Sequence, residues 1–347
     1  MTPQWLTAQL QAAGLSARVT DFAQADVGTG QVGRCVRYDL QFAEEPQAQV
    51  PRSLVAKFSS DDPTSKDTGQ ALLTYKTEVN FYRSIAPQVG IRVPRCYFAA
   101  IDAANREHLI LMDNMAPAQQ GDQIQGCSPA VVRQAVMELV GLQAPTWRDA
   151  RWYKLLGRVQ DGPFADMRGL YNSTMPGFVE RYAPMMDARH IGLIEAIGAA
   201  GQCPMFEFHG EHFALEHYDF RLDNVLIGGT ASAPEVTTVD WQSVRVGKPL
   251  SDVAYFIGSA LPAEVRRTVE MDILREYHEA LLRAGVTDFS WEACYREYRK
   301  GIFSGFAVSV VSPVLVQRTE RGDKMFTTMA TRYAEMALDH QAEEFLS

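Results

Sequence analysis

The sequence predicts an α+β fold of two lobes, and a change in its hydrophobic pattern is the main reason. Up to residue 112 most segments alternate apolar and polar residues as strands do, with one long amphipathic helix among them. From Asp113 onward apolar residues recur at helical spacing, interrupted by a short β insertion. We therefore expect an N-terminal lobe over residues 1–113, with an antiparallel five-stranded sheet and one main helix. A mostly helical C-terminal lobe should follow over 114–347.

The elements of the N-terminal lobe follow from local signals. A first helix over 5–13 has leucines at helical spacing and stops at Gly14, a residue suited to a helix C-cap. The main helix spans 69–86 and ends before Pro87, after a polar loop over 59–68. Strand-like alternation marks five further segments: 17–24, 34–42, 53–58, 92–99 and 107–112.

The C-terminal lobe has helical periodicity over long stretches and strand-like segments only near its middle. The predicted helices are 129–143, 164–200 in two pieces, 249–260, 263–284, 288–310 and 320–345. The β insertion covers 213–228 and 235–241. About 100 residues precede this insertion within the lobe, enough for extra helices folded over a substrate pocket.

Composition excludes several classes of protein. The 347 residues carry a formal net charge of −9, and no Lys/Arg-rich run interleaved with aromatics offsets it, so nucleic acid is not an expected partner. No apolar stretch approaches the roughly 20 residues of a membrane span, and the Met1 end has no signal-like apolar region. The five scattered cysteines lack metal-ligand spacing, which indicates reduced thiols. We expect a soluble, cytoplasmic protein that binds no membrane.

The strongest functional signal is the segment His217-Tyr-Asp-Phe-Arg-Leu-Asp-Asn224, followed by Asp240 at the end of the next strand. Phosphoryl transfer requires a carboxylate that orients and deprotonates the attacking hydroxyl, plus two oxygen ligands for the Mg²⁺ that bridges the nucleotide phosphates. We assign Asp219 to the hydroxyl and Asn224 and Asp240 to the metal, because the hairpin between them should bring all three together. Each residue alone is equally consistent with a turn. The ordered set favours the functional interpretation.

Three neighbouring polar residues are predicted to be structural. Asp223 is explained as a turn or helix cap. His217 is expected to pack beneath the loop and orient it by hydrogen bonds. Asp252 lies near the start of a helix, where an acid interacts favourably with the helix dipole, although it is equally suited to bonding the backbone of the catalytic loop. Either structural role is favoured over a catalytic one.

A second signal is the Gly-x-Gly-x-x-Gly pattern of Gly28, Gly30 and Gly33. Alone it is weak, because dinucleotide-binding folds and kinases both use it, and a hairpin also explains clustered glycines. A dinucleotide fingerprint passes from a strand into a helix, whereas residues 34–40 continue as a strand. The pattern therefore favours a β-loop-β flap whose glycines let backbone amides approach phosphates.

Lys57 and Glu78 form the third signal. Lys57 lies inside an apolar strand and requires an anionic partner there, which Glu78 of the following helix can provide. Together they would hold the α- and β-phosphates of a nucleotide. The alternatives are a solvated edge position for Lys57 and an ordinary surface glutamate for Glu78.

With these motifs, the chain resembles the superfamily of aminoglycoside phosphotransferases, choline kinases and ecdysteroid kinase-like proteins, and most closely the bacterial ecdysteroid kinase-like group. The resemblance runs from about Gly28 to Phe256. It implies a protein-kinase-like fold, ATP or GTP with Mg²⁺, and a linker in which the backbone of Met112, Asn114 and Met115 binds the adenine. Many relatives have His-Ala where this chain has Gln143-Ala144.

The resemblance implies a small-molecule kinase that phosphorylates a hydroxyl group. A nucleotide-binding pseudokinase and a dinucleotide-dependent oxidoreductase are the alternatives, and a kinase for aminoglycosides or choline is a narrower one. Aromatic and large apolar residues are dense over 143–182, and the charged residues of that stretch are not predominantly acidic. Since a polycation would require a cluster of carboxylates, we expect a neutral or anionic acceptor with an apolar body.

Overall fold

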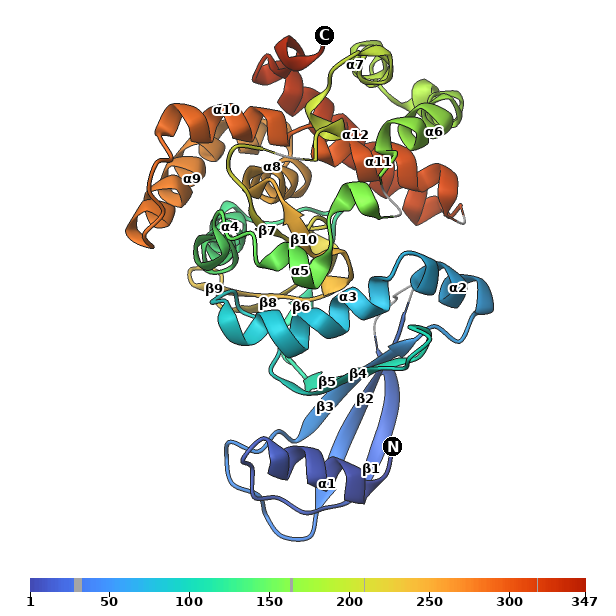
Figure 1. The fold of residues 1–347 in the computed structure, drawn as a ribbon, viewed down its shortest axis with the longest axis vertical. Helices are drawn as coiled ribbons and strands as arrows, with labels where there is room; N and C mark the ends of the chain where they lie inside the picture. Colours follow the sequence, from blue (N-terminus) through green and yellow to red (C-terminus); the bar gives the residue numbers. More distant parts are fainter. Residues whose placement is uncertain (28–32, 163–164, 209, 317) are drawn as a thin grey trace. The chain divides into compact units, whose positions relative to one another are not determined.

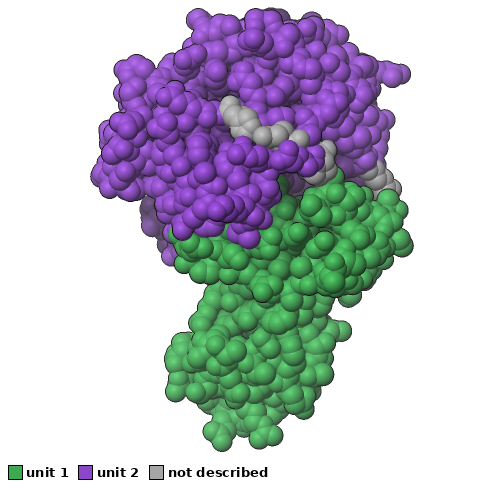
Figure 2. Space-filling model, viewed as in Figure 1, with its two compact units in different colours: residues 1–88, 93–117, 239–243 green, residues 89–92, 118–238, 244–347 purple. Residues whose placement is uncertain are grey.

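The computed structural model describes residues 1–27, 33–162, 165–208, 210–316 and 318–347 (Figure 1). The chain forms two compact units, neither of which is continuous in sequence (Figure 2). Unit 1 comprises Met1–Gln88, Val93–Pro117 and Val239–Ser243, and unit 2 comprises Val89–Arg92, Ala118–Thr238 and Val244–Ser347. The predicted division into domains at residue 113 remains a prediction.

Unit 1 contains the predicted five-stranded sheet. Its strands are β1 (Val19–Val27), β2 (Gly33–Phe42), β3 (Ser53–Ser59), β4 (Cys96–Ile101) and β5 (His108–Asp113). They pair in the order β1-β2-β3-β5-β4, and every pair is antiparallel. The α+β fold class predicted from the sequence is therefore confirmed.

Strand alternation gives this sheet two different faces. Helix α1 (Pro3–Ala12) lies along one face of the sheet (Figure 1). On that face Leu54, Ala56 and Leu111 pack into an apolar core to which α1 contributes Leu6 and Leu10. Residues next to these in the strands point to the opposite face. Lys57, which follows Ala56, is therefore presented on the face that α1 does not cover.

The predicted helix 69–86 is wrong in its bounds, because the chain forms two helices, α2 (Pro63–Ala71) and α3 (Thr74–Asn80). The segment expected to be a loop begins α2, since the Asp62 side chain accepts a hydrogen bond from the third helical residue and Pro63 suits the first turn. The break falls at Leu73, whose φ is +57°. A single π-helical turn, Phe81–Ile85, then extends α3.

Unit 2 contains two small antiparallel sheets. One is β6 (Gln119–Gln120), β8 (Val225–Gly229) and β9 (Pro234–Thr238), and the other pairs β7 (Ala214–Glu216) with β10 (Arg245–Gly247). These are the predicted β insertion together with two short strands that the sequence did not indicate.

The remaining elements of unit 2 are helices. They are α4 (Pro129–Gln143), α5 (Trp152–Leu156), α6 (Met167–Tyr182), α7 (Ala188–Ala199), α8 (Pro249–Ala260), α9 (Ala263–Arg283), α10 (Trp291–Gly301), α11 (Ser304–Leu315) and α12 (Glu320–Asp339). The predicted single helix 288–310 is wrong, because the chain divides there into α10 and α11. At the junction Gly301 lies so close to α8 that an added Cβ would come within 2.6 Å of the Leu250 carbonyl oxygen.

Helix α8 is the centre of unit 2, and all twelve of its residues are buried. It packs against α4, α10, α11 and α12 and against strand β7. Since β7 leads directly into the segment that starts at His217, the most buried helix of the unit supports the predicted catalytic loop. Among the described residues, no helix is long and apolar enough to cross a membrane.

Candidate functional site

In unit 1 the ammonium group of Lys57 lies between two carboxylates. Its Nζ is 2.8 Å from Glu78 Oε1, 2.7 Å from Glu78 Oε2 and 2.7 Å from Asp240 Oδ1. The predicted pairing of Lys57 with Glu78 is therefore present. Asp240 joins them through the 239–243 segment, although it follows Lys57 by 183 residues.

Burial makes this cluster strongly interacting. The side chains of Lys57 and Glu78 are 13% and 1% exposed, and that of Asp240 is 29% exposed. Burial alone would lower the pKa of Lys57, but the carboxylates of Asp240 and Glu78 outweigh it and raise that pKa well above its ordinary value. Burial raises the pKa of Glu78, and Lys57 opposes this.

Aromatic stacking and a left-handed backbone hold Asp240 in place. Trp241, which is fully buried, stacks face to face on Phe81 with ring centroids 3.7 Å apart and an interplanar angle of 5°. Asp240 has a φ of +65°, and Gln242 Nε2 donates to its Oδ2 at 3.3 Å. The stacking therefore anchors the residue next to the predicted metal ligand.

The other residues predicted to bind nucleotide also belong to unit 1 where the structure describes them. Gly33 begins β2, and an added Cβ would lie 3.0 Å from the Phe58 carbonyl oxygen and 3.3 Å from Lys57 Cε. A side chain at position 33 would therefore crowd the lysine stem. Gly28 and Gly30 lie outside the described residues.

The predicted adenine-binding segment ends strand β5 and continues beyond it. Met112 is buried and pairs with Val55 in the sheet. The side chain of Asn114 is held locally, because its Nδ2 donates to Ser53 Oγ at 2.8 Å and its Oδ1 accepts from the Ala116 N–H at 3.2 Å. Met115 is half-buried. Both ends of the Asn114 amide are therefore engaged within unit 1.

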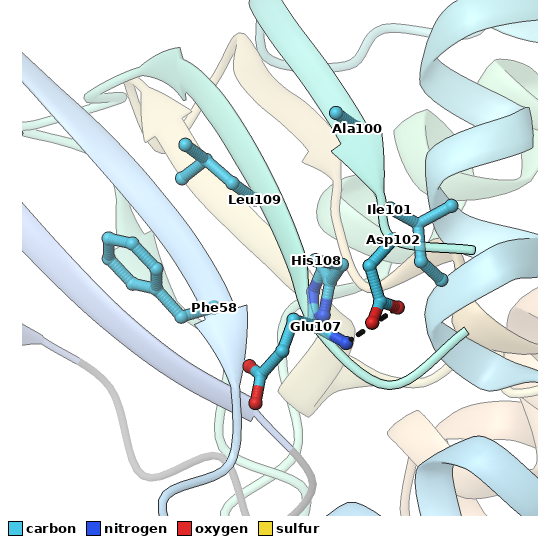
Figure 3. Close-up of a pocket in the computed structure, with 7 residues that line it drawn as sticks. All are labelled: Phe58, Ala100, Ile101, Asp102, Glu107, His108 and Leu109. Carbon is cyan, nitrogen blue, oxygen red and sulfur yellow. Dashed lines mark hydrogen bonds between the residues drawn. The ribbon is translucent and has the colours of Figure 1, made fainter. Parts of the chain in front are cut away.

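A separate pocket of about 420 Å³ lies at the end of the same sheet, around the β4–β5 turn (Figure 3). Phe58, Ala100 and Leu109 line it, and they are neighbours across strands β3, β5 and β4. Since Phe58 follows Lys57 in its strand, these side chains point to the face opposite Lys57. At its rim the Glu107 N–H donates to Asp102 Oδ1 at 3.1 Å. The pocket is therefore distinct from the Lys57 cluster.

In unit 2 the catalytic loop is attached to α8 through Asp252. Its two carboxylate oxygens accept the N–H groups of His217 at 2.6 Å and Tyr218 at 2.9 Å. Burial, together with nearby Glu216, raises the pKa of Asp252 well above its ordinary value, and the two N–H donors act in the opposite direction. The predicted bonding of Asp252 to the loop backbone is confirmed.

Tyr218 turns the chain immediately before the predicted catalytic residue. Its φ of +71° lies in the left-handed region, which is costly for an aromatic residue. The guanidinium of Arg245 covers its ring at 3.4 Å and donates through Nε to Glu216 Oε1 at 2.5 Å. The stacked arginine and the buried glutamate therefore compensate for the strained backbone.

Asp219 follows this turn, and three side chains donate hydrogen bonds to its carboxylate. Arg221 Nε lies 3.1 Å from Oδ1 and 3.3 Å from Oδ2, the Tyr255 hydroxyl lies 3.0 Å from Oδ1, and Asn224 Nδ2 lies 2.9 Å from Oδ2. The side chain of Asp219 is 24% exposed. The carboxylate is therefore fixed in orientation while one edge faces solvent.

The last two residues of the loop, Asp223 and Asn224, have different hydrogen-bond partners. Asn224 Nδ2 also donates to the Asp219 carbonyl oxygen at 2.8 Å, so its nitrogen is committed to the loop and its Oδ1 has no partner among the described residues. Asp223 instead accepts from Arg221 Nη1 at 2.5 Å and from the Gln123 N–H at 3.2 Å. Asn224 thus offers an oxygen for a cation. The turn or helix cap predicted for Asp223 is wrong, because its carboxylate pairs with Arg221 and accepts a backbone N–H that lies 100 residues away in the chain.

Each of the two predicted metal ligands offers an oxygen atom within its own unit. Asn224 in unit 2 presents an amide oxygen for which the described residues supply no partner, and Asp240 in unit 1 presents a carboxylate beside a cation. Hard oxygen ligands of this kind suit Mg²⁺. No group of three or more His, Cys, Asp or Glu side chains with metal-binding geometry occurs among the described residues.

Sequence reasoning missed Arg221 and Tyr255, both of which contact Asp219. Arg221 stands two residues after Asp219, a spacing that could have drawn attention to it. Tyr255 stands three residues after Asp252, one helical turn further along the same face of α8. Its contact with Asp219 spans 36 residues and depends on how the helix packs beneath the loop.

Gln143, at the position where the resemblance implies a histidine, is part of the core. It is fully buried at the end of α4, donates through Nε2 to the Pro249 carbonyl oxygen at 2.9 Å and accepts from the Tyr277 hydroxyl at 2.5 Å. It therefore ties α4 to α9 and to the start of α8. Its amide serves packing at this position.

Comparison with known proteins identifies the fold. The model of the ecdysteroid kinase-like family matches residues 164–285. A structure from Ralstonia eutropha JMP134, provisionally assigned to the aminoglycoside phosphotransferases, aligns with a TM-score of 0.56 at 13% identity and covers 100% of this chain and 99% of its own. The chain has the fold of these small-molecule kinases. No curated protein matches the sequence.

Two further structures agree. Wild-type aminoglycoside 2′-phosphotransferase-IIIa in complex with GDP aligns with a TM-score of 0.54 at 9% identity, covering 96% of this chain and 99% of its own. The GDP and kanamycin complex of APH(2″)-IIIa has a TM-score of 0.52 at 9% identity, with 98% and 99% coverage. The resemblance inferred from the sequence motifs is confirmed, and the small-molecule kinase is the class of enzyme that the family and the fold indicate.

Proposed function

We propose that the protein is a Mg²⁺-dependent phosphotransferase that moves the γ-phosphate of ATP or GTP to a hydroxyl group of a small molecule. The observation that carries this proposal is the cluster in which Lys57 contacts both Glu78 and Asp240. A buried lysine fixed by a helical glutamate and lying beside a metal-binding carboxylate is the phosphate-binding arrangement of protein-kinase-like enzymes. The GDP bound in two structures of the same fold supports a purine nucleotide.

Each unit contributes a different part of the proposed reaction. In unit 1, Lys57 would pair with the α- and β-phosphates, Glu78 would keep its ammonium in place, and backbone groups near Met112 to Met115 would bind the base. In unit 2, Asp219 would accept a hydrogen bond from the acceptor hydroxyl. Gly33 would keep the flap close to the phosphates, and Gly28 and Gly30 are proposed for the same role from sequence alone.

The acceptor oxygen forms a bond to the γ-phosphorus, the bond from that phosphorus to the β,γ-bridging oxygen breaks, and the nucleoside diphosphate leaves. The acceptor proton passes to the carboxylate of Asp219. Asn224 and Asp240 would hold the Mg²⁺ that neutralises negative charge on the phosphates. Asn224 also holds Asp219 through its amide nitrogen, so one side chain would link the metal site to the base.

Charge pairing near the loop supports an acceptor that is not a polycation. Asp223 pairs with Arg221, which also contacts Asp219, and Glu216 pairs with Arg245. Further along the unit, Asp323 pairs with Arg318 at 2.7 Å and accepts from the Tyr182 hydroxyl at 2.6 Å. A polyamine substrate requires carboxylates that are free to bind it, and these three are already compensated.

Of the large apolar and aromatic residues in 143–182, fewer are available to contact an acceptor than the sequence suggested. Five of the large side chains are buried and therefore serve the core: Trp152, Met167, Tyr171, Phe178 and Tyr182. Trp147, Tyr153 and Met175 are half-buried and keep surface for a ligand, and Phe164 lies outside the described residues. We propose a neutral or anionic alcohol with an apolar body.

An acceptor screen tests the function. ADP or GDP formation would be measured with Mg²⁺ and a panel of apolar alcohols, hydroxyacyl compounds, choline and kanamycin, and phosphorylated products would be detected by mass spectrometry. We expect transfer to apolar alcohols or hydroxyacyl compounds, and transfer about 100- to 1,000-fold slower by the Asp219→Asn variant. Nucleotide binding without transfer to any acceptor would instead indicate a pseudokinase. Transfer to kanamycin with none to the apolar alcohols would refute the proposed acceptor class.

A further inference from the structure

The hydroxyl of Tyr255 is placed to control the orientation of Asp219. It donates to Asp219 Oδ1 at 3.0 Å, and the residue is 1% exposed within α8. The ring of Tyr255 lies parallel to that of Tyr333, with centroids 5.6 Å apart and an interplanar angle of 8°. The Tyr333 hydroxyl in turn donates to the Tyr255 carbonyl oxygen at 2.9 Å. Both the side chain and the backbone of Tyr255 are therefore held by the core.

Helix α8 thus contacts the catalytic loop through two side chains that lie one helical turn apart. Asp252 accepts the N–H groups of His217 and Tyr218 and fixes the loop backbone. Tyr255 fixes the side chain that follows, that of Asp219. Because every residue of α8 is buried, both contacts come from a rigid element and not from the surface.

The three donors on Asp219 differ in how firmly they are held. Arg221 is a long side chain that shares its guanidinium between Asp219 and Asp223. Asn224 is the residue expected to bind metal as well. Tyr255 has neither of these competing demands, since its hydroxyl has Asp219 as its hydrogen-bond partner. Tyr255 is therefore the donor that fixes the orientation of the Asp219 carboxylate most firmly.

Resting on the proposed function, we propose that Tyr255 is a positioning residue that directs Asp219 toward the acceptor alcohol in preference to water. The hydroxyl of Tyr255 is buried and points at Asp219, so it has no access to acceptor or phosphate and acts through Asp219. An alcohol must align with both the carboxylate and the γ-phosphate, whereas water is small and can attack in many orientations. A carboxylate that has lost its fixed orientation should therefore lose transfer more than hydrolysis.

The test is the ratio of phosphorylated acceptor to total nucleoside diphosphate formed by the full-length Tyr255→Phe variant. With the best acceptor of the panel, we expect the transfer rate to fall about tenfold, as loss of one hydrogen bond to a charged group predicts. Diphosphate formation without acceptor should change less than about twofold, and the KM for nucleotide should stay the same. The ratio therefore falls, which a general loss of folded protein would not cause.

Tyr277→Phe is the matched control. Tyr277 is also fully buried in unit 2 and also loses one hydrogen bond, to Gln143, but it does not contact the loop. Its ratio of transfer to hydrolysis should equal that of the wild type. If Tyr255→Phe does not fold, Tyr255→Met fills similar volume with a flexible side chain and answers the same question.

Two outcomes overturn the inference, and they can be distinguished. An unchanged ratio in a folded Tyr255 variant, with transfer intact in the wild type, refutes the positioning role alone. An absence of transfer by the wild type to any acceptor refutes the proposed function and this inference with it. A fall of the ratio in Tyr277→Phe equal to that in Tyr255→Phe would show that the loss of any buried tyrosine hydroxyl in unit 2 lowers the ratio, and would also refute the positioning role.

Discussion

Replacing Lys57 by Met should destabilise the protein more than replacing Glu78 by Gln. Lys57→Met leaves Glu78 and Asp240 facing each other without the ammonium that lies 2.7 Å from each. Glu78→Gln removes one charge but leaves the contact between Lys57 and Asp240. The two variants therefore differ in the number of carboxylates left without a cation.

The magnitude follows from burial. Removing one partner of a buried ion pair costs about 3–5 kcal/mol, and the 1% exposure of the Glu78 side chain places Lys57→Met in that range. In Glu78→Gln the amide still accepts a hydrogen bond from Lys57, so the loss should be about 1–3 kcal/mol. Either cost is a large fraction of the roughly 5–15 kcal/mol that stabilises a folded domain.

Urea unfolding of wild type, both single variants and the double variant would measure these costs. Trp241, stacked on Phe81, provides a fluorescent reporter within unit 1. The double variant Lys57→Met/Glu78→Gln should lose less stability than the two single losses together, because it leaves no uncompensated charge on Glu78. If Lys57→Met costs no more than Glu78→Gln, or if the losses simply add, the buried cluster does not have the energetics assigned to it.

Three further predictions concern individual residues. Asp219→Asn should keep nucleotide affinity and fold but lower turnover about 100- to 1,000-fold, and unchanged turnover would remove it as the base. Asp240→Ala should abolish Mg²⁺-dependent nucleotide binding in calorimetric titrations while Asp223→Ala does not, since Asp223 pairs with Arg221; equal losses would mean that the metal ligands are misassigned. Burial lowers the pKa of His108 to about 3, so the folded protein binds that proton less readily than the unfolded chain does. Stability should fall as pH drops below about 6.5, by about 2 kcal/mol at pH 5 from this group, and His108→Gln should remove that part of the slope in urea unfolding; an unchanged slope would contradict it.

The sequence predicted the elements best where one signal dominated. Helices 129–143 and 249–260 have the predicted bounds, because a proline marks the start of each and apolar periodicity continues to the end. Helix α2 was missed because its residues are polar and small, and it forms through the Asp62 cap and Pro63. The break at Leu73 also escaped, since leucine gives no sequence signal for a left-handed backbone.

The candidate site could be predicted from sequence as far as its residue types and their order allowed. Lys57 and Glu78 were paired correctly because a charge inside an apolar strand requires a partner. The contact between Asp240 and Lys57 and the contact between Tyr255 and Asp219 were not foreseen. Each depends on packing between elements that are distant in the chain, which periodicity and local motifs do not encode.

The return of residues 239–243 to unit 1 has a consequence for folding during translation. An N-terminal unit leaves the ribosome first, at about 5–20 residues per second. Unit 1 nevertheless lacks Asp240 beside Lys57 and Trp241 against Phe81 until the ribosome has also synthesised residues 118–238. For a period on the order of ten seconds, the nascent chain therefore carries a sheet lobe in which Trp241 does not yet cover the ring of Phe81. During that interval the uncovered apolar surface is available to a chaperone. In a fragment ending at residue 117 that surface would stay uncovered.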